Sequence, residues 1–360
     1  MKLTFVIPTR KRHRELAACL RSIADQVQEG QDVNIVVLFN HEEIDTVRVI
    51  ERCAAKWPFI SSVGFDGEPD YATKFKEMFL AAPESDWVWT FGDDESLEPN
   101  ALKFMLPRLE KAEPELAFIH ISEKVRSTGS GHTYTGRMID LCCELGWVEF
   151  TGFISGNITR GNLLAECGRT PNWGEYAKTA FVQSCALLEV LRKEQAQFID
   201  LPLFKSQDDL DEHVAEVRNA NWAAANTEVR YMKLADALQL MYDQGFLKSK
   251  LPVKFFRYHN YHLWDRHLIA YVLMWLQENK IWFDDWVFYV KRLASFVADK
   301  DAAAKICEEA AGAQRWVLMH AALSENCKIL KADLMGILEK RTIETYPLTF
   351  VPKTEERKAA

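Results

Sequence analysis

Three carboxylates stand side by side at Asp93, Asp94 and Glu95, directly after the apolar run "WVWTFG". We call these three residues the acidic motif. Adjacent acids repel one another, and each is costly to remove from water without a partner. A divalent cation would relieve the repulsion, because Mg²⁺ or Mn²⁺ is commonly held by one or two carboxylates and the phosphates of a substrate. The same stretch could instead be the acidic start of a helix, with Ser96 or Asn100 as its cap.

The elements that would position the acidic motif are visible in the first hundred residues. Apolar runs typical of buried strands cover four stretches, residues 3–7, 34–38, 60–63 and 87–91. Apolar side chains at helical spacing mark the stretches between them, residues 16–27, 44–54 and 72–82. This βαβαβαβ order predicts an α/β fold with a mostly parallel sheet and helices on both faces.

Three polar stretches follow the ends of these predicted strands. They read "PTRKR" after the first strand, "NHEE" after the second and "GDDE" after the fourth. Ligands of open α/β sheets bind at the carboxyl ends of the strands. We therefore expect the three stretches to line one crevice.

The rest of the chain changes character twice. Strand-like runs at residues 116–121 and 198–203 flank a Gly/Ser/Thr-rich loop, "RSTGSGHTYTGR", which we expect to be mobile. A helix is predicted at residues 177–191, and the segment 152–160, "GFISGNITR", is typical either of a ligand-facing strand or of a core strand. Beyond about residue 219 the pattern is almost wholly helical.

Composition and run lengths argue against three classes: a nucleic-acid-binding protein, a secreted protein and a protein that spans a membrane. The 360 residues are 48% hydrophobic, enough for a substantial core, and the net charge of -8 comes without a Lys/Arg-rich block for nucleic acid. The first apolar run is shorter than the roughly 7 to 15 residues of a secretion signal, and the longest later run, 268–276, is about half of the roughly 20 residues that span a bilayer. Eight cysteines without a CxxC pair predict reduced thiols in a cytosolic protein.

The stretches "FVIPTRKRHRELAACLRSI" and "WVWTFGDDESLEPNAL" resemble the nucleotide-sugar half of a family 2 glycosyltransferase of the GT-A fold. That family has a first strand ending in a Pro-Thr-Arg-like turn, and an Asp-x-Asp-type motif after a hydrophobic strand. The resemblance implies a Rossmann-like, mostly parallel sheet followed by a helical C-terminal domain. We expect four units: a nucleotide-sugar half at 1–110, an acceptor half at 111–215, a helical domain at 216–345 and a tail at 346–360.

The resemblance also assigns roles to residues. Contacts with the nucleotide-sugar donor are implied for Pro8, Thr9, Arg10, Asn40, Lys74, Asp93 and Asp94. A Mn²⁺ or Mg²⁺ ion is implied at Asp94 and Glu95, with Glu95 in place of the more usual last Asp. The family also usually carries an Asp that reads uracil at the end of the second strand. Because Phe39 and Asn40 stand there instead, a UDP-sugar is favoured without being fixed.

An inverting transfer needs a carboxylate that takes the proton of the acceptor hydroxyl. The family places it near a helix start in the acceptor half, where this chain has "TPNWGEYAKTAF", and Glu175 is the candidate. A Glu in a first helical turn is also stabilised by the helix dipole without any catalytic duty. In "SQDDLDEHV", Asp208, Asp209 and His213 could contact the metal or diphosphate, or could be solvated charge.

The resemblance implies a cytoplasmic, metal-dependent, inverting glycosyltransferase that moves a sugar from a nucleotide-sugar donor to a saccharide or lipid-linked acceptor. The setting it implies is bacterial-type surface-polysaccharide or glycoconjugate assembly, at the inner face of the membrane through peripheral contact. The aromatic segment 255–290 is typical of a helical core, with a homodimer face as one use, or of a surface that contacts membrane or glycan.

Other classes of protein share parts of this pattern. A haloacid-dehalogenase-like phosphatase also has an acidic motif after an apolar strand, but it needs an Asp two positions after its nucleophile, where Glu95 or Ser96 stands here. A nucleotidyltransferase would need a Gly-rich loop after the first strand, and "PTRKRHR" has no glycine. A non-catalytic carbohydrate-binding or scaffold protein on the same fold remains as an alternative.

Overall fold

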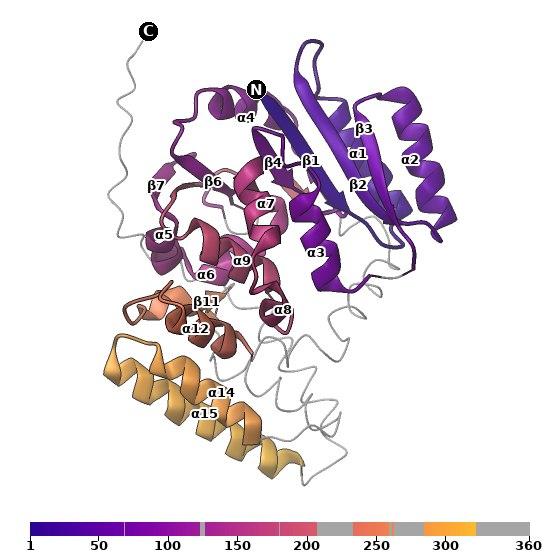
Figure 1. Cartoon of the computed structure of the whole chain (residues 1–360). Coiled ribbons are helices and arrows are strands. Elements are labelled where there is room, and N and C mark those ends of the chain that lie inside the picture. Colours follow the sequence, from indigo (N-terminus) through magenta and orange to yellow (C-terminus); the bar gives the residue numbers. More distant parts are fainter. Residues whose placement is uncertain are drawn as a thin grey trace.

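The computed structural model describes residues 1–67, 69–122, 127–179, 181–206, 233–258, 261–262 and 284–321. Its main element is an eight-stranded sheet with the order β3-β2-β1-β4-β8-β6-β9-β7 (Figure 1). The strands are β1 Lys2–Pro8, β2 Asp32–Asn40, β3 Ile60–Phe65, β4 Trp87–Thr90, β6 Leu116–Ile121, β7 Thr133–Arg137, β8 Asn157–Arg160 and β9 Gln195–Ile199. Because strands from residues 2 to 199 share it, this one sheet spans both predicted halves of the domain.

The first four strands of the sheet are parallel, as their apolar runs predict. β1 pairs in parallel with β2 and β4, and β2 pairs in parallel with β3. β8 lies between β4 and β6 and runs antiparallel to both, whereas β6 and β9 are parallel and β7 closes the edge antiparallel to β9. The start of β8 therefore meets the carboxyl ends of its neighbours β4 and β6.

Helices cover both faces of the sheet. They are α1 His13–Ala24, α2 Ile44–Lys56, α3 Tyr71–Leu80, α4 Ala101–Glu110, α5 Met138–Leu145, α6 Trp147–Gly152, α7 Gly161–Arg169, α8 Trp173–Tyr176 and α9 Val182–Leu191. One hydrophobic core packs α1, α2 and α4 against one face, and a second packs α3, α7 and α9 against the other. Leu3, Phe5 and Ile7 of β1 belong to the first core and Val6 to the second, because successive side chains of a strand point to opposite faces.

In the described stretches of the C-terminal part, the helices are α12 Leu234–Asp243, α14 Asp284–Ser295 and α15 Lys300–Ala321. Figure 1 shows α14 and α15 side by side beneath α12. The buried side chains of α12 and of the short 3-10 turn η2 Val253–Phe256 extend the second core. Phe255 stacks on Trp147 of α6 with ring centroids 5.4 Å apart. No helix in the described ranges is both long and apolar enough to cross a bilayer.

Most of the predicted strands are confirmed, and three predicted stretches need correction. The run predicted at 198–203 forms β9 only as far as Ile199, since Pro202 has no N–H for a ladder and the Asp200 side chain bonds a neighbouring loop. The helix predicted at 177–191 is α9, which begins only at Val182, and Glu175, expected to open that helix, lies in the separate short helix α8. The segment 152–160 is a strand only in its last four residues, β8.

The acidic motif is also not the start of a helix. Residues 95–97 form β5 Glu95–Leu97, which pairs antiparallel with β10 Phe204–Ser206. The following helix, α4, begins at Ala101, and its N-cap Asn100 adopts a left-handed conformation without a side-chain capping bond. Helix capping therefore does not explain the three carboxylates.

Candidate functional site

The turn after β1 meets the end of β2 and the acidic motif. The Thr9 backbone N–H donates to the Leu38 carbonyl at 2.9 Å, which continues the β1–β2 ladder past Pro8. The buried Thr9 hydroxyl donates to Asp93 Oδ2 at 2.7 Å. Thr9 therefore ties the first polar stretch to the third, as the parallel order of the strands predicts.

Lys74 reaches the same turn from α3. Its Nζ donates to the Thr9 carbonyl oxygen at 2.8 Å, across 65 positions of sequence. α3 begins at an N-cap, Asp70, whose carboxylate accepts from the Thr73 backbone N–H, and this cap fixes where Lys74 stands one residue later. Thr9 thus contacts both Asp93, through its hydroxyl, and Lys74, through its carbonyl oxygen.

Arg12, which we did not assign from the sequence, contacts two carboxylates of the acidic motif. Its Nη1 donates to Asp93 Oδ1 at 3.1 Å and to Asp94 Oδ2 at 2.8 Å. Arg12 is the residue before α1 and makes no capping bond there. The signal in the sequence is "PTRKR" itself, in which the third basic residue, next to the helix start, faces the acidic motif.

Burial dominates the electrostatics of this cluster. Asp93 is 4% exposed, and burial raises its pKa to about 6, although Arg12 and the Thr9 hydroxyl act in the opposite direction. Burial alone would lower the pKa of Arg12, but Asp93 and Asp94 raise it overall, so the guanidinium is firmly charged. The neighbouring thiol of Cys19 has a pKa well above its usual range because of burial and the three carboxylates.

Asn40 ends β2 and is 2% exposed. Among the described residues, its Oδ1 has no hydrogen-bond partner, and neither has Oε1 of nearby Glu43, whose other oxygen accepts from the Lys11 backbone N–H. A buried acceptor without a donor is costly, and native proteins usually supply a partner from solvent or a ligand. These two oxygens are therefore fit to accept N–H groups of a ligand beside the first polar turn.

Residues just before β8, in the predicted acceptor half, form hydrogen bonds with the residues just before the acidic motif. The Ser155 hydroxyl accepts from the Gly92 backbone N–H at 2.9 Å, and the Thr90 hydroxyl donates to the Ile154 carbonyl at 2.8 Å. Gly92 leaves little room, since a Cβ at that position would stand 2.9 Å from Asp94 Oδ1. The segment before β8 therefore fixes the end of β4, which carries the acids.

The remaining predicted residues lie in different surroundings. Arg10 is exposed beside Thr9, and Glu95 is buried in β5. Glu175 is exposed in α8, and its carboxylate pairs with the Lys178 ammonium at 2.6 Å. The charged stretch with Asp208, Asp209 and His213 lies outside the described residues, as does most of the aromatic segment 255–290.

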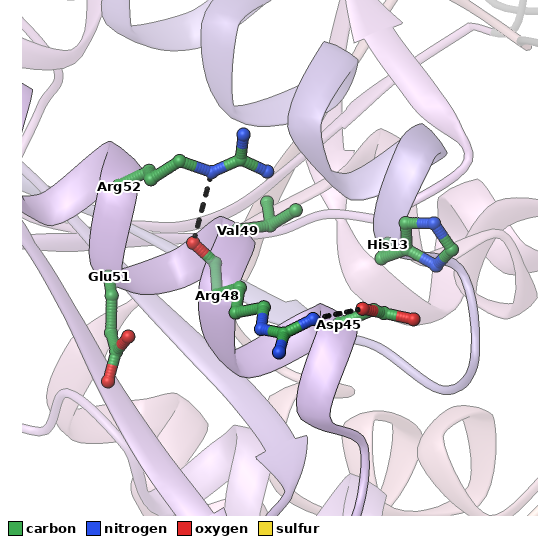
Figure 2. A pocket seen from close by; sticks show the side chains of 6 residues that line it. All are labelled: His13, Asp45, Arg48, Val49, Glu51 and Arg52. Carbon is green, nitrogen blue, oxygen red and sulfur yellow. Dashed lines mark hydrogen bonds and ion pairs between the residues drawn. The ribbon is translucent and has the colours of Figure 1, made fainter.

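A cavity of about 500 Å³ lies between α1 and α2. Figure 2 shows its lining, which is His13, Asp45, Arg48, Val49, Glu51 and Arg52. Arg48 pairs with Asp45 at 3.3 Å, and Arg52 Nε donates to the Arg48 carbonyl, so both cations have partners within the lining. No residue assigned from the sequence lines this cavity.

The acidic motif fits a divalent cation that a substrate would help to hold. Within the part of the chain that the structure describes, no three His, Cys, Asp or Glu side chains form a ready-made metal cage. Mg²⁺ and Mn²⁺ do not need one, because one or two carboxylates plus substrate phosphates commonly suffice. Asp94 and Glu95 supply hard oxygen donors, and the charge of Asp94 adds to burial in raising the pKa of Asp93. Arg12 already occupies one of the Asp94 oxygens.

Residues 4–165 match the family model described as "Glycosyl transferase family 2". Residues 4–165 belong to this glycosyltransferase family. The match spans the turn after β1, Asn40, Lys74 and the acidic motif, together with the acceptor-side segment before β8. It does not favour the phosphatase or the non-catalytic alternatives.

Solved structures share the fold of the glycosyltransferase domain and of the segment after it. S. aureus TarS 1–349 in complex with UDP-GlcNAc is 12% identical, with a TM-score of 0.54, and the match covers 90% of this chain and 92% of that one. A longer S. aureus TarS structure is 14% identical, with a TM-score of 0.51 and coverage of 89% of this chain. This chain spans only 55% of that longer structure. No curated protein sequence is significantly similar to this chain.

Proposed function

We propose that this glycosyltransferase transfers a sugar, with inversion, from a nucleotide-sugar donor to a saccharide or lipid-linked acceptor, and that it requires Mn²⁺ or Mg²⁺. The observation that carries the proposal is the hydrogen bond between Thr9 and Asp93, with Lys74 on the Thr9 carbonyl. It joins the turn after β1 to the acidic motif at the edge where ligands of such sheets bind. The family match over the same residues supports it.

The donor side of the proposal assigns a task to each residue. Asn40 Oδ1 would accept an N–H of the base, and Lys74, Arg10 and the turn at Pro8 and Thr9 would line the nucleotide pocket. A UDP-sugar is favoured, and the UDP-GlcNAc complex of S. aureus TarS, a protein of the same fold, is consistent with that preference. Asp94 and Glu95 would hold the metal ion, with Asp93 beside them, and the ion would supply charge stabilisation for the departing diphosphate.

The acceptor side rests on Glu175, the proposed general base. Its exposure leaves room for an acceptor hydroxyl, but Lys178 holds the carboxylate at 2.6 Å. A base must be within hydrogen-bond reach of the proton that it takes, so the acceptor hydroxyl would have to replace Lys178 as the partner of Glu175. Glu175 would then receive the hydroxyl proton as the sugar carbon is attacked.

The setting belongs to the same proposal and rests on the sequence resemblance. We place the protein in surface-polysaccharide or glycoconjugate assembly in the cytoplasm, in peripheral contact with the inner face of the membrane. The helical C-terminal domain would provide a homodimer face. A lipid-linked acceptor would account for the contact with the membrane.

A melting scan combined with donor turnover tests the donor and metal sites. We expect UDP with Mn²⁺ to raise the melting temperature of the wild type and of a surface control, Glu110→Ala, because a ligand of the native state stabilises it by mass action. Asp94→Ala and Glu95→Ala should lose the metal-dependent part of the shift and the release of UDP from UDP-sugars, while keeping the fold. Unchanged turnover in both variants would contradict the assignment.

A further inference from the structure

Arg12 is a basic residue whose side chain contacts the acidic motif of the glycosyltransferase. A single guanidinium nitrogen, Nη1, contacts Asp93 at 3.1 Å and Asp94 at 2.8 Å. The Arg12 side chain is only 16% exposed, so little solvent screens these contacts. Arg12 therefore bridges two carboxylates whose mutual repulsion would otherwise call for a cation.

The two carboxylates that Arg12 bridges differ in how they are held. Asp93 is also fixed from the far side by the Thr9 hydroxyl, which donates to its Oδ2, and its side chain is 6% exposed. The side chain of Asp94 is 18% exposed, and its Oδ2 accepts from Arg12. Of the two, Asp94 is the one that solvent and ions can reach, and it is also the proposed metal ligand.

We propose that Arg12 acts as a resident counter-ion that holds Asp94 in the donor-free enzyme and releases it when the divalent cation and the diphosphate bind. This inference rests on the proposed function. A metal ion and a guanidinium repel each other when they share one carboxylate, so Arg12 must weaken metal binding while it stays there. A guanidinium also binds phosphate oxygens well, so the diphosphate offers Arg12 a new partner.

Arg12 then couples the two ligands. The diphosphate draws Arg12 away from Asp94 and strengthens metal binding, and by linkage the metal strengthens nucleotide binding by the same factor. Arg12 is a positioning residue in this scheme, since it acts through Asp94. The enzyme would thus bind metal weakly until a donor is present.

Titration of the whole protein with Mn²⁺ tests this scheme, with free Mn²⁺ measured by electron paramagnetic resonance in the absence and presence of UDP. We expect Arg12→Gln to bind Mn²⁺ about tenfold more tightly than the wild type without UDP, because a nearby positive charge has been removed. UDP should enhance Mn²⁺ affinity less in Arg12→Gln than in the wild type. The control Arg48→Gln removes an exposed arginine of α2 that pairs with Asp45, and it should match the wild type in both titrations.

The outcomes separate this inference from the proposed function. Equal or weaker Mn²⁺ binding by Arg12→Gln without UDP overturns the proposal that Arg12 holds Asp94 until the diphosphate binds. This conclusion stands even if the wild type binds Mn²⁺ and UDP as the proposed function requires. Failure of the wild type to bind Mn²⁺ at all overturns both. If Arg12→Gln does not fold, Arg12→Met also removes the charge from a long side chain and must still bind Mn²⁺ more tightly than the wild type without UDP. Equal affinity in Arg12→Met overturns the proposal that Arg12 holds Asp94 until the diphosphate binds.

Discussion

A single carboxylate, Asp200, organises the loop that the composition predicted to be mobile. It accepts hydrogen bonds from the Ser127 hydroxyl, from the Thr128 hydroxyl and backbone N–H, and from the Ser130 hydroxyl. Burial alone would raise the pKa of Asp200, but these hydrogen bonds lower it below its usual value. The small residues of the loop therefore serve as donors around one buried acid.

We expect Asp200→Ala to destabilise the protein by about 2 kcal/mol near neutral pH, because it removes a charged acceptor together with all the hydrogen bonds that the loop donates to it. Since the pKa is lower in the folded state, the stabilisation is complete above the unfolded pKa of about 3.9 and is lost as pH falls through the folded value. The difference between variant and wild type should therefore shrink below about pH 4. Urea denaturation across this range measures it, with the exposed Asp32→Ala as control. A difference that does not depend on pH would contradict the assignment.

The buried Asn40 side chain should contribute to the affinity for UDP. We expect Asn40→Ala to weaken UDP binding about tenfold, which corresponds to the loss of one buried hydrogen bond of about 1.4 kcal/mol. Asn40→Asp, which restores the acid usual in the family, should retain UDP binding because it keeps the acceptor oxygen. Calorimetric titration with UDP and Mn²⁺ gives both affinities, and the exposed Asn162→Ala serves as control. Full UDP affinity in Asn40→Ala would remove Asn40 from the base pocket.

At the scale of elements, a buried polar network joins α12 to the segment that carries Glu175. Glu189 of α9 accepts from Thr170 at 2.6 Å, from Asn172 at 3.1 Å and from Tyr176 at 2.5 Å. Asn172 also exchanges two amide hydrogen bonds with Gln244, at 2.8 and 2.9 Å. The residue after α12 therefore helps to fix the start of α8.

Gln244→Ala removes a hydrogen-bond partner of the buried Asn172 amide, so it should lower the free energy of unfolding by about 1–3 kcal/mol. The matched control is Gln239→Ala on α12, which removes an exposed hydrogen bond to Asp243 and should change stability by less than about 0.5 kcal/mol. Chemical denaturation of both variants is the measurement. Equal stability of the two variants would show that the amide pair does not hold α12 in place.

The sequence predicts some elements well and others poorly for physical reasons. β1, β4 and β6, and the second half of β2, carry buried side chains on both faces, so each appears as an apolar run of strand length. β5 and β7 are short and less apolar, and only their pairing with β10 and β9 makes them strands. Arg12 escaped prediction because nothing in "PTRKR" tells which basic side chain turns toward the acidic motif. The Glu189 network escaped prediction because its members come from separate elements that only the folded chain brings together.

At the scale of the whole molecule, the second core does not stop at the glycosyltransferase domain. Side chains of α12 and η2, such as Leu238 and Phe256, are fully buried in the same cluster as residues of α6 and α9. Phe255 is also fully buried, between Trp147 and Phe256. The C-terminal segment and the sheet therefore share one hydrophobic core, so we expect them to unfold together.

Phe255→Ala tests this continuity. We expect it to cost about 3–5 kcal/mol and to lower the stability of the sheet as well as of the helical part, in one transition. Phe255→Leu conserves more of the volume and should cost less. Tryptophan fluorescence and far-ultraviolet circular dichroism should follow the same denaturation curve in each variant. Two separate transitions, with only one of them shifted by the substitution, would mean that the parts unfold independently.

Because β8 lies beside β4 but comes about 70 residues later in the chain, the donor site can form only after β8 has been synthesised. Ser155, just before β8, holds the Gly92 N–H at the end of β4, and β8 itself separates β4 from β6. A ribosome-bound chain that has emerged only as far as α4 contains every residue proposed to bind the donor, yet it lacks the strand beside β4. Since domains generally fold as units during synthesis, we expect competence to bind nucleotide to arise only after residue 160 has emerged.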